Sequence, residues 1–469
     1  MTGFDELAET DGDDEFKAWL SKLLDAKQEI VAFVASRRPG RAVGVFDGYL
    51  KGSFNLSLVV RFSDGEEDGE GKGAGPKAVI RFPKPGHTAT DIRDEKVRNE
   101  VQVLQFLSER TSIPVPRVVS WGLLADSPQQ LGPFIIMDYV DGVSLATLLK
   151  QPTATEQDEV ILADAVDDAK LDYVYEQLAA YMLQLSRLDF AAIGAISKCP
   201  ATNTWHARER PLTYNMNELK TVVSAYPDHD GRPTAPFPTA SFFLHFLADE
   251  HLIHLRTQRN LADDREDAKK RFVARHRFKQ LVPRYCTHDA GPFKLFCDDL
   301  QPTNMLADPD SLRITAVLDW EFTNAMPAQF AHDPPWWLLL LGPDMWLERH
   351  SMEEFMARYG PRLEQFLRAL ERVERKGSEE KGVERDGTLP LLSERMRESW
   401  ATGRFWFDYG IRKSFDVDAV YWAALHKEGD DDDDVLGDES MRAEMERFVD
   451  VKMEQLEAYK AECEVRFAS

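Results

Sequence analysis

The sequence predicts an α+β fold of two lobes, in which a small β-rich lobe precedes a large, mainly helical lobe. Short runs of β-branched and apolar residues, typical of strands, dominate residues 45–141, with one amphipathic helix among them. In residues 142–469 most apolar positions recur at helical spacing instead. With 469 residues, the chain is long enough to give each lobe a core of its own.

Composition argues against several classes of protein. The formal net charge of −24 at pH 7 disfavours nucleic acid or an anionic membrane as the main partner. The four cysteines include no CxxC pair, so we expect free thiols in a reducing compartment. The amino terminus is acidic and lacks the apolar core of a signal peptide, and the longest apolar stretch, 336–341, is too short to span a bilayer. We therefore expect a cytoplasmic location and no membrane partner.

The first expected elements are helices and a β-hairpin. Apolar residues in the range 15–37 recur at helical spacing, which predicts one or two amphipathic helices in an N-terminal extension of residues 1–44. The range 45–62 holds two short β runs around Gly52 and Ser53, which predicts a hairpin with a tight tip. Backbone amides at such a tip can bind phosphate, but a plain hairpin explains the pattern equally well.

The next strand and helix offer a buried ion pair. Residues 77–82 form a β run in which alternation places Arg81 on the face opposite Ile80. In the helix expected at residues 94–107, Glu100 falls within the apolar stripe. A carboxylate on a buried helical face needs a cation, and Arg81 on the preceding strand can supply it. The alternatives are a solvent-facing arginine on an edge strand and an exposed glutamate.

Two further strands, at residues 117–123 and 132–142, complete the expected small lobe. The second is apolar and turns polar at Asp138. The Gly- and Glu-rich residues 63–76 and the acid run 430–434 are expected to be solvated connections. Helical spacing in the large lobe predicts helices at residues 144–149, 171–188, 240–256, 264–282, 330–341, 352–376, 389–407, 415–426 and 440–467.

Residues 297–327 carry the strongest chemical signal. Asp299 and Asn304 lie close together on a Pro-containing segment that is expected to be a rigid loop. Asp319 directly follows the β-branched run 314–318, which predicts a strand. A carboxylate at the end of a buried strand, facing a loop with an acid and an amide, suits a divalent cation. The alternative is an acidic loop beside an ordinary core strand.

The pattern D-L-x-P-x-N-x-L at residues 299–306, followed by L-D-W-E at 318–321, resembles the aminoglycoside phosphotransferase and choline kinase family. Residues 189–194 also resemble the end of a large-lobe helix in this family. The resemblance implies a protein-kinase-like fold with ATP bound between the lobes. It further implies Mg²⁺-dependent transfer of the γ-phosphoryl group to a hydroxyl of a small molecule that is aminoglycoside- or choline-like and often cationic.

The resemblance also implies roles for individual residues. Asp299 would orient and deprotonate the acceptor, while Asn304 and Asp319 would hold Mg²⁺. The hairpin tip and the strand–helix ion pair would contact the ATP phosphates, and the backbone at the end of the last small-lobe strand would bind adenine. The residues implied in these ATP contacts are Gly52, Ser53, Arg81, Glu100, Asp138 and Val140.

Two departures from the family pattern keep other functions open. Cys297 stands where the family usually has histidine, and Arg81 stands where it has lysine. These departures favour a non-catalytic nucleotide-binding protein as the first alternative. A protein kinase is the second alternative, although D-W-E replaces D-F-G and no A-P-E-like segment follows.

Overall fold

A five-stranded antiparallel sheet forms the framework of the smaller lobe, with strand order β1-β2-β3-β5-β4. The structure is a computed structural model that describes residues 4–38, 43–63, 75–155, 158–223, 233–381, 390–427 and 439–468. The predicted hairpin and the three following strands are confirmed. The strands are β1 (Val43–Lys51), β2 (Asn55–Ser63), β3 (Lys77–Pro83), β4 (Val118–Gly122) and β5 (Phe134–Asp138).

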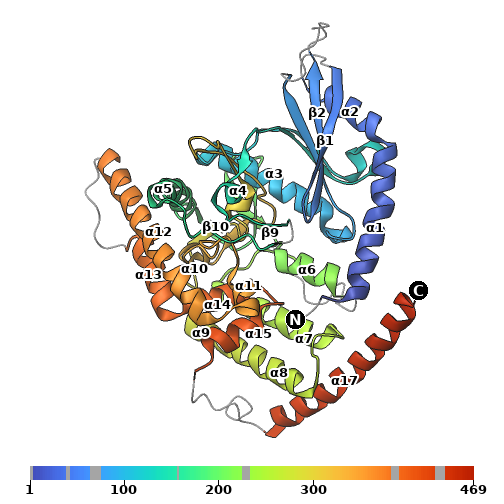
Figure 1. Cartoon of the computed structure of the whole chain (residues 1–469), viewed down its shortest axis with the longest axis vertical. Helices are drawn as coiled ribbons and strands as arrows, with labels where there is room; N and C mark the ends of the chain where they lie inside the picture. The colour runs from blue at the N-terminus through green and yellow to red at the C-terminus, as the bar shows by residue number, and fades with distance from the viewer. Residues whose placement is uncertain are drawn as a thin grey trace.

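Helices cover both faces of this sheet (Figure 1). On one face, α1 (Glu6–Asp25) and α2 (Lys27–Ser36) pack against alternate strand residues that include Ile80 and Phe82. On the other face, α3 (Arg93–Arg110) packs against residues of the opposite parity, such as Ile135. This alternation follows from the period of two along a strand, and it turns Arg81 toward α3.

The N-terminal helix begins at Glu6, earlier than the predicted start at residue 15. Asp5 caps it, because its Oδ1 accepts hydrogen bonds from the amides of Leu7 and Ala8 at 3.1 and 3.2 Å. The acidic first turns favour a helix start because carboxylates stabilise the positive end of the helix dipole. Figure 1 shows α1 running from the small lobe past α6 (Tyr214–Val222) to the large lobe.

The larger lobe is mainly helical, so the predicted α+β architecture with two lobes is confirmed (Figure 1). Its longest helices pack in pairs, α12 on α5 and α17 on α8. The helices other than α6 are α4 (Leu145–Leu149), α5 (Asp168–Leu185), α7 (Ala240–Thr257), α8 (Arg265–Gln280), α9 (Val282–Tyr285), α10 (Ala328–Ala331), α11 (Pro343–Arg349), α12 (Met352–Lys381), α13 (Leu392–Thr402), α14 (Arg404–Ile411), α15 (Val417–Val420) and α17 (Glu439–Phe467).

Residues 297–327 run between and through the strands of two small antiparallel sheets. In one, β10 (Phe293–Phe296) lies between β7 (Asp189–Phe190) and β13 (Asn324–Met326). In the other, β11 (Met305–Ala307) lies between β6 (Val143–Ser144) and β12 (Ile314–Val317). The loop 297–304 joins β10 to β11, and residue 319 follows β12. Both ends of this loop are therefore held in sheets.

The prediction of a helix at residues 330–341 is wrong. Only α10 is helical there, and residues 334–341 form irregular turns. Pro334 and Pro335 lack the amides that would continue α10. The predicted helix at 389–407 is divided at Gly403, whose φ of +76° ends α13.

Other sequence predictions concern connections and membrane spans. Residues 64–74 of the connection expected at 63–76, and the acid run 430–434, lie outside the described residues. Within the described part of the chain, no helix combines the length and apolar character needed to cross a membrane.

Candidate active site

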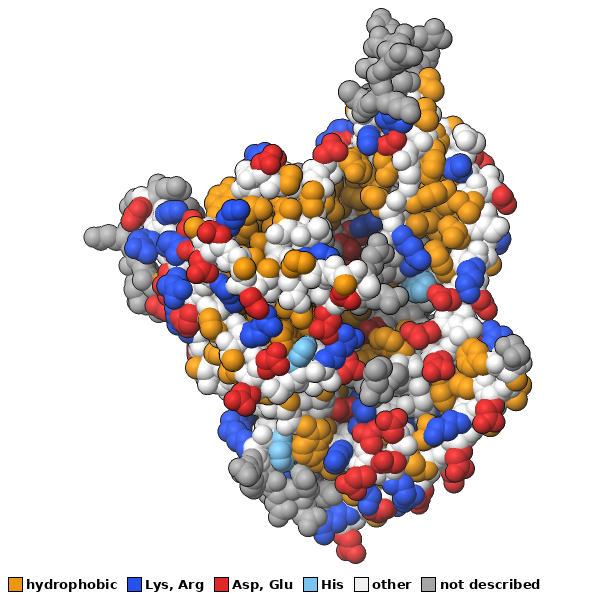
Figure 2. All heavy atoms as spheres, in the orientation of Figure 1, with side chains coloured by type: hydrophobic (Ala, Val, Ile, Leu, Met, Phe, Trp, Pro, Cys, Tyr) orange, Lys and Arg blue, Asp and Glu red, His pale blue; other side chains and the backbone are white. Residues whose placement is uncertain are grey.

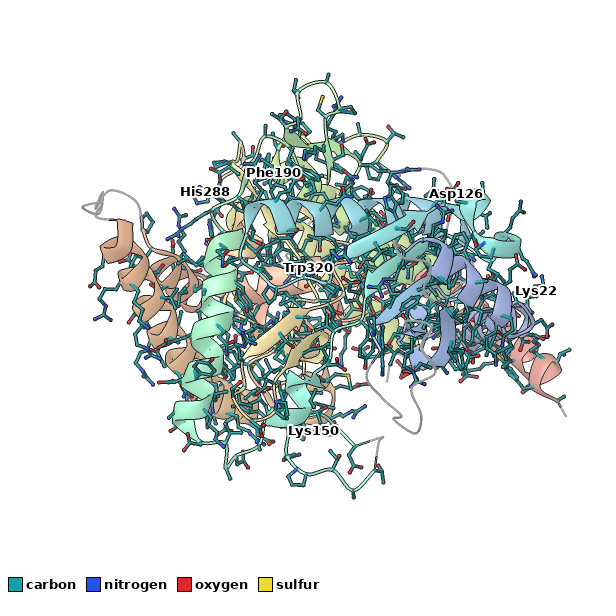
Figure 3. The ribbon with its side chains drawn as sticks, turned by 90° about the horizontal axis from the view of Figure 1, so that it is seen from above. Lys22, Asp126, Lys150, Phe190, His288 and Trp320 are labelled. Carbon is teal, nitrogen blue, oxygen red and sulfur yellow. The ribbon has the colours of Figure 1, made fainter. Side chains whose placement is uncertain are left out.

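A cavity of about 980 Å³ lies between the sheet of the small lobe and the loop 297–304. Figure 2 shows the surface hollowed between the two lobes. Seen from above in Figure 3, Trp320, which stands between two acidic residues of the cavity wall, lies near the centre of the molecule. All nine residues that the sequence singled out line this cavity, namely Gly52, Ser53, Arg81, Glu100, Asp138, Val140, Asp299, Asn304 and Asp319.

The loop 297–304 holds the Asp299 carboxylate by hydrogen bonds from both sides. Asn304 Nδ2 donates to Asp299 Oδ2 at 2.6 Å and to the Asp299 carbonyl at 3.1 Å, while Gln301 Nε2 donates to Oδ1. The amide of Leu318 donates to the Asn304 carbonyl at 2.7 Å, which ties the loop to the segment after β12. Burial raises the pKa of Asp299, and the two side-chain donors oppose that rise.

Asp319 occupies a backbone conformation that few residues adopt. Its φ is +60°, in the left-handed region that aspartate tolerates better than most side chains do. Its Oδ1 is buried and has no hydrogen-bond partner among the described residues. The Nη1 of Arg81 lies 3.7 Å from that oxygen. Burial and the nearby Glu321 raise the pKa of Asp319 well above its ordinary value, and the opposing effect of Arg81 and Lys96 does not cancel that rise.

Arg81 and Glu100 form the ion pair that alternation and helical spacing predict. Arg81 Nη2 binds Glu100 Oε2, and the Glu100 side chain is 1% exposed. Burial opposes the charge on Arg81, but Glu100, Asp319 and Glu321 together raise its pKa above the ordinary value. A permanently charged guanidinium therefore lies beside Asp319, held in place by α3.

A second buried ion pair was missed by the sequence analysis. The ammonium of Lys96 on α3 binds Glu321 Oε2, and both side chains are buried. Lys96 Nζ also donates to Asn55 Oδ1 at 3.1 Å, and Asn55 Nδ2 donates to Glu321 Oε2 at 2.8 Å. Burial opposes the charge on Glu321, but Lys96 and Arg81 lower its pKa. The sequence feature that could have revealed Lys96 is its position one helical turn before Glu100, which places both side chains on the same face of the helix.

The hairpin tip is fixed by a buried lysine. Lys84 Nζ donates to the carbonyls of Gly52 and Ser53 at 3.1 and 2.8 Å. The amide of Gly52 donates to the Asn55 carbonyl at 3.0 Å and closes the turn. The tip therefore projects over the cavity in a defined conformation, with its carbonyl groups turned toward Lys84.

The end of β5 connects the two lobes. The amide of Asp138 donates to the Arg117 carbonyl at 3.0 Å, and the amide of Tyr139 donates to the Lys77 carbonyl at 3.2 Å. The Asp138 carboxylate binds Arg38 Nη2 at 2.8 Å and Arg117 Nε at 2.7 Å. Its side chain is thus engaged away from the cavity, so any ligand contact by this residue falls to its backbone.

Cys297 packs beneath the loop rather than facing the cavity. Its side chain is buried, with Sγ 4.0 Å from the Asp319 carbonyl. Burial raises the pKa of the thiol well above its ordinary value, and a neutral buried thiol is a poor nucleophile. The cysteine therefore acts as a packing group between the loop 297–304 and the segment after β12.

Comparison with known proteins gives a family match over most of the chain. The model of the phosphotransferase enzyme family matches residues 66–374. "Altered inheritance of mitochondria protein 9, mitochondrial" of Debaryomyces hansenii is 21% identical over 54% of this chain and 44% of its own length. "Clavilactone A biosynthesis cluster protein Y" of Ampulloclitocybe clavipes is 23% identical over 69% of this chain and 71% of its own length. The chain thus spans less than half of the first of these relatives.

Solved structures with similar folds include two phosphotransferases. The ethanolamine kinase of Plasmodium vivax is 12% identical with a TM-score of 0.39, covering 89% of this chain and 81% of its own. The aminoglycoside phosphotransferase APH(3'')-Id of Streptomyces rimosus, in complex with ADP and streptomycin, is 14% identical with a TM-score of 0.35, covering 85% and 99%. Both TM-scores are below 0.5.

The relatives contradict the expected cytoplasmic location. The matching proteins of Debaryomyces hansenii, Scheffersomyces stipitis and Candida glabrata are all named as mitochondrial. The acidic amino terminus and scattered cysteines led to the cytoplasmic prediction, but reduced thiols are not confined to the cytoplasm, so these features do not distinguish one interior compartment from another.

Proposed function

Since the chain belongs to the phosphotransferase enzyme family, we propose that it transfers the γ-phosphoryl group of ATP to a hydroxyl group of a small molecule. The observation that carries this proposal is the convergence of Asp299, Asn304, Asp319 and Arg81 on one cavity between the lobes. In the reaction, the acceptor oxygen forms a bond to the γ-phosphorus, the bond from that phosphorus to ADP breaks, and the hydroxyl proton leaves.

Asp299 is the residue proposed to receive that proton. Its carboxylate is held by Gln301 and Asn304, so it reaches the cavity in one orientation and can align an acceptor hydroxyl. Burial raises its pKa, which makes the carboxylate a stronger base than a free aspartate.

Asn304 and Asp319 fit a magnesium ion. The Asn304 amide donates through Nδ2 to Asp299, which leaves its Oδ1 as a ligand, and the buried Asp319 Oδ1 lacks a hydrogen-bond donor. Within the described residues, no group of three or more His, Cys, Asp or Glu side chains is arranged for a metal. Mg²⁺ is usually held by one or two carboxylates plus substrate phosphates, so this small oxygen set suits it. When bound, Mg²⁺ neutralises charge on the β- and γ-phosphates.

The remaining wall of the cavity is proposed to hold ATP. Arg81, fixed by Glu100, would bind phosphate oxygens in a bidentate manner. The hairpin tip at Gly52 and Ser53 would cover the phosphates from above. The amide of Asp138 already donates a hydrogen bond to the Arg117 carbonyl. Adenine would therefore be bound by the carbonyl of Asp138 and by the backbone of Val140.

The test is a mass-shift screen. The protein is incubated with ATP and Mg²⁺ in a metabolite extract, and compounds that gain the mass of a phosphoryl group are sought. A phosphorylated small molecule and stoichiometric ADP are expected. Mg²⁺-dependent ATP binding without any transfer would instead identify a non-catalytic nucleotide-binding protein, and phosphorylation of generic protein substrates would identify a protein kinase.

We also propose that the chain acts in mitochondria. The names of three relatives support this location. Microscopy of the full-length protein, tagged at its C-terminus and expressed in its native host, is the test. A signal coincident with a mitochondrial matrix marker is expected, and a diffuse cytoplasmic signal would refute the proposal.

A further inference from the structure

Two basic side chains from the C-terminal helices line the active-site cavity. Arg412 and Lys413 directly follow α14 and lie in the wall that also contains Asp298, Asp299 and Trp336. They fall outside residues 66–374, the part of the chain that matches the family model. This end of the cavity therefore contains groups that the shared reaction does not account for.

Arg412 is neutralised by a neighbour of the proposed base. Its Nη1 binds Asp298 Oδ1, and its Nε donates to the Asp408 carbonyl at 2.7 Å. The guanidinium also covers two aromatic rings of the cavity wall, at 4.8 Å from the Phe296 centroid and 5.1 Å from the Phe330 centroid. Arg412 thus anchors the loop 297–304 to the C-terminal helices.

Lys413 has no such partner. Its ammonium lies 4.7 Å from the Tyr409 ring centroid and 5.5 Å from that of Trp336. Among the described residues, no carboxylate lies within ion-pair distance of it, and no side-chain hydrogen bond engages it. Burial opposes its charge, but Tyr409, Asp344 and Asp416 raise its pKa well above the ordinary value, so the group stays an ammonium.

The carboxylates of the cavity wall are already committed, and a further basic side chain of the wall, Lys51, lies beside the hairpin tip, next to Gly52. The carboxylates of Glu100, Asp138, Asp298 and Glu321 each bind a basic side chain. Those of Asp299 and Asp319 belong to the proposed transfer and metal site. Of the two basic side chains in the wall near Trp336, Arg412 is paired and Lys413 is not, and the Asp344 and Asp416 carboxylates that raise the pKa of Lys413 do not line the cavity.

The aromatic rings at this end do not favour a cationic ligand. Ammonium groups bind over aromatic faces, but the Trp336 and Phe330 rings already contact Lys413 and Arg412. A second cation placed there would be repelled by a like charge at short range, and the reduced dielectric of a cavity strengthens that repulsion. An anionic group would instead be attracted to Lys413.

We propose that the acceptor carries an anionic group, a carboxylate or a phosphate, which Lys413 binds while the reacting hydroxyl lies at Asp299. This inference rests on the proposed phosphotransferase function and names the substrate class of the same site. Lys413 offers three N–H donors on a compact charge. The proposed anionic acceptor takes the place of the cationic acceptor that the family resemblance led us to expect.

The first test uses a matched set of polyols. Gluconate, glucitol, glucamine and glucitol 6-phosphate share a six-carbon polyol chain and differ in a terminal carboxylate, hydroxyl, ammonium or phosphate. A metabolite extract separated into anion-exchange-bound, cation-exchange-bound and unbound fractions extends the set. ATP-dependent phosphoryl mass gains are expected for anionic compounds, and comparing the carboxylate with the phosphate arm tells which anion is used. Gains confined to cationic or neutral compounds would overturn the inference while leaving the proposed function intact.

The second test uses variants of Lys413 with the best acceptor from the first. Lys413→Met is expected to lower kcat/KM for that acceptor at least tenfold, mainly through KM, with the Kd of ATP·Mg²⁺ unchanged. Lys413→Arg restores the charge and should recover most of the loss, and Lys413→Gln serves if the Met variant does not fold. Lys17→Met, on an exposed α1 side chain, is the control. Unchanged acceptor KM in Lys413→Met and Lys413→Gln would overturn the inference, whereas absence of any transfer by the wild type would overturn the proposed function as well.

Discussion

Asn55 and Glu321 lie 266 positions apart in the sequence, yet Asn55 Nδ2 donates to Glu321 Oε2 at 2.8 Å. Lys96 binds both side chains, so β2, α3 and the segment after β12 meet at one buried point. Asp319 lies two residues before Glu321. The same cluster therefore joins the lobes and positions the proposed metal ligand.

The first prediction concerns the stability of this cluster. Lys96→Met leaves the buried Glu321 carboxylate without its cation, and we expect the free energy of unfolding to fall by about 3–5 kcal/mol. The double variant Lys96→Met/Glu321→Gln removes both charges and should recover part of that loss. Urea unfolding at pH 7 measures all three proteins.

The matched control for this pair is the exposed ion pair of Lys17 and Asp14, with a 3.1 Å separation. Lys17→Met should cost less than about 1 kcal/mol. Equal losses in Lys96→Met and Lys17→Met would show that the buried pair has no special role. A double variant no more stable than Lys96→Met would also contradict the prediction.

The second prediction concerns the proposed base. Asp299→Asn keeps the size of the side chain but cannot accept the acceptor proton, so kcat should fall by about 10²–10⁴-fold while the Kd of ATP·Mg²⁺ stays within about twofold. Asp308→Asn, in an exposed turn where Asp308 Oδ1 accepts from the Ser311 amide at 2.8 Å, should keep full turnover. Steady-state ADP release and nucleotide titration measure both effects. Full turnover by Asp299→Asn would remove this residue from the chemistry.

The third prediction concerns magnesium. Asp319→Ala removes the carboxylate whose Oδ1 lacks a hydrogen-bond partner, so Mg²⁺ should no longer strengthen ATP binding. Calorimetric titrations with and without Mg²⁺ are expected to differ in the wild type and to coincide in the variant. Asp310→Ala, which changes an exposed acid outside the cavity, should behave as the wild type does. A Mg²⁺ effect of wild-type size in Asp319→Ala would place the metal elsewhere.

Much of the site could be predicted from local pattern. The period of two in β3 and the helical period in α3 each placed one partner of the Arg81–Glu100 pair, because each period is set by backbone geometry. The residues 299–319 were found because the acid, the amide and the second acid sit close in sequence, on a loop and at the end of the next strand. In each case one secondary-structure element decides where a side chain points.

The parts that could not be predicted depend on tertiary contacts. Asn55 and Glu321 become neighbours only when the lobes pack, and no local period joins them. Lys413 follows a helix with no recognisable motif, so its place in the cavity wall depends on how α14 packs. The prediction of a helix at residues 330–341 was wrong because the spacing of the apolar residues there reflects burial in the core. Irregular turns bury these side chains as well as a helix does.

The last prediction concerns pH and Glu218, one helical turn after Tyr214 on α6. Tyr214 Oη donates to Glu218 Oε1 at 3.3 Å, and burial raises the pKa of Glu218 from its ordinary value of 4.5 to about 8. A folded-state pKa above the unfolded one means that the folded protein binds the proton more tightly. The stability from this group is therefore fully present below about pH 4.5 and is lost as the pH rises through about 8.

Glu218→Gln stays neutral at every pH. Its free energy of unfolding, relative to that of the wild type, should therefore rise by on the order of a few kcal/mol between pH 5 and pH 8.5. Urea unfolding at both pH values measures this, with Glu353→Gln on the exposed start of α12 as the control. A constant difference between wild type and Glu218→Gln across this range would show that Glu218 is ionised in the folded protein.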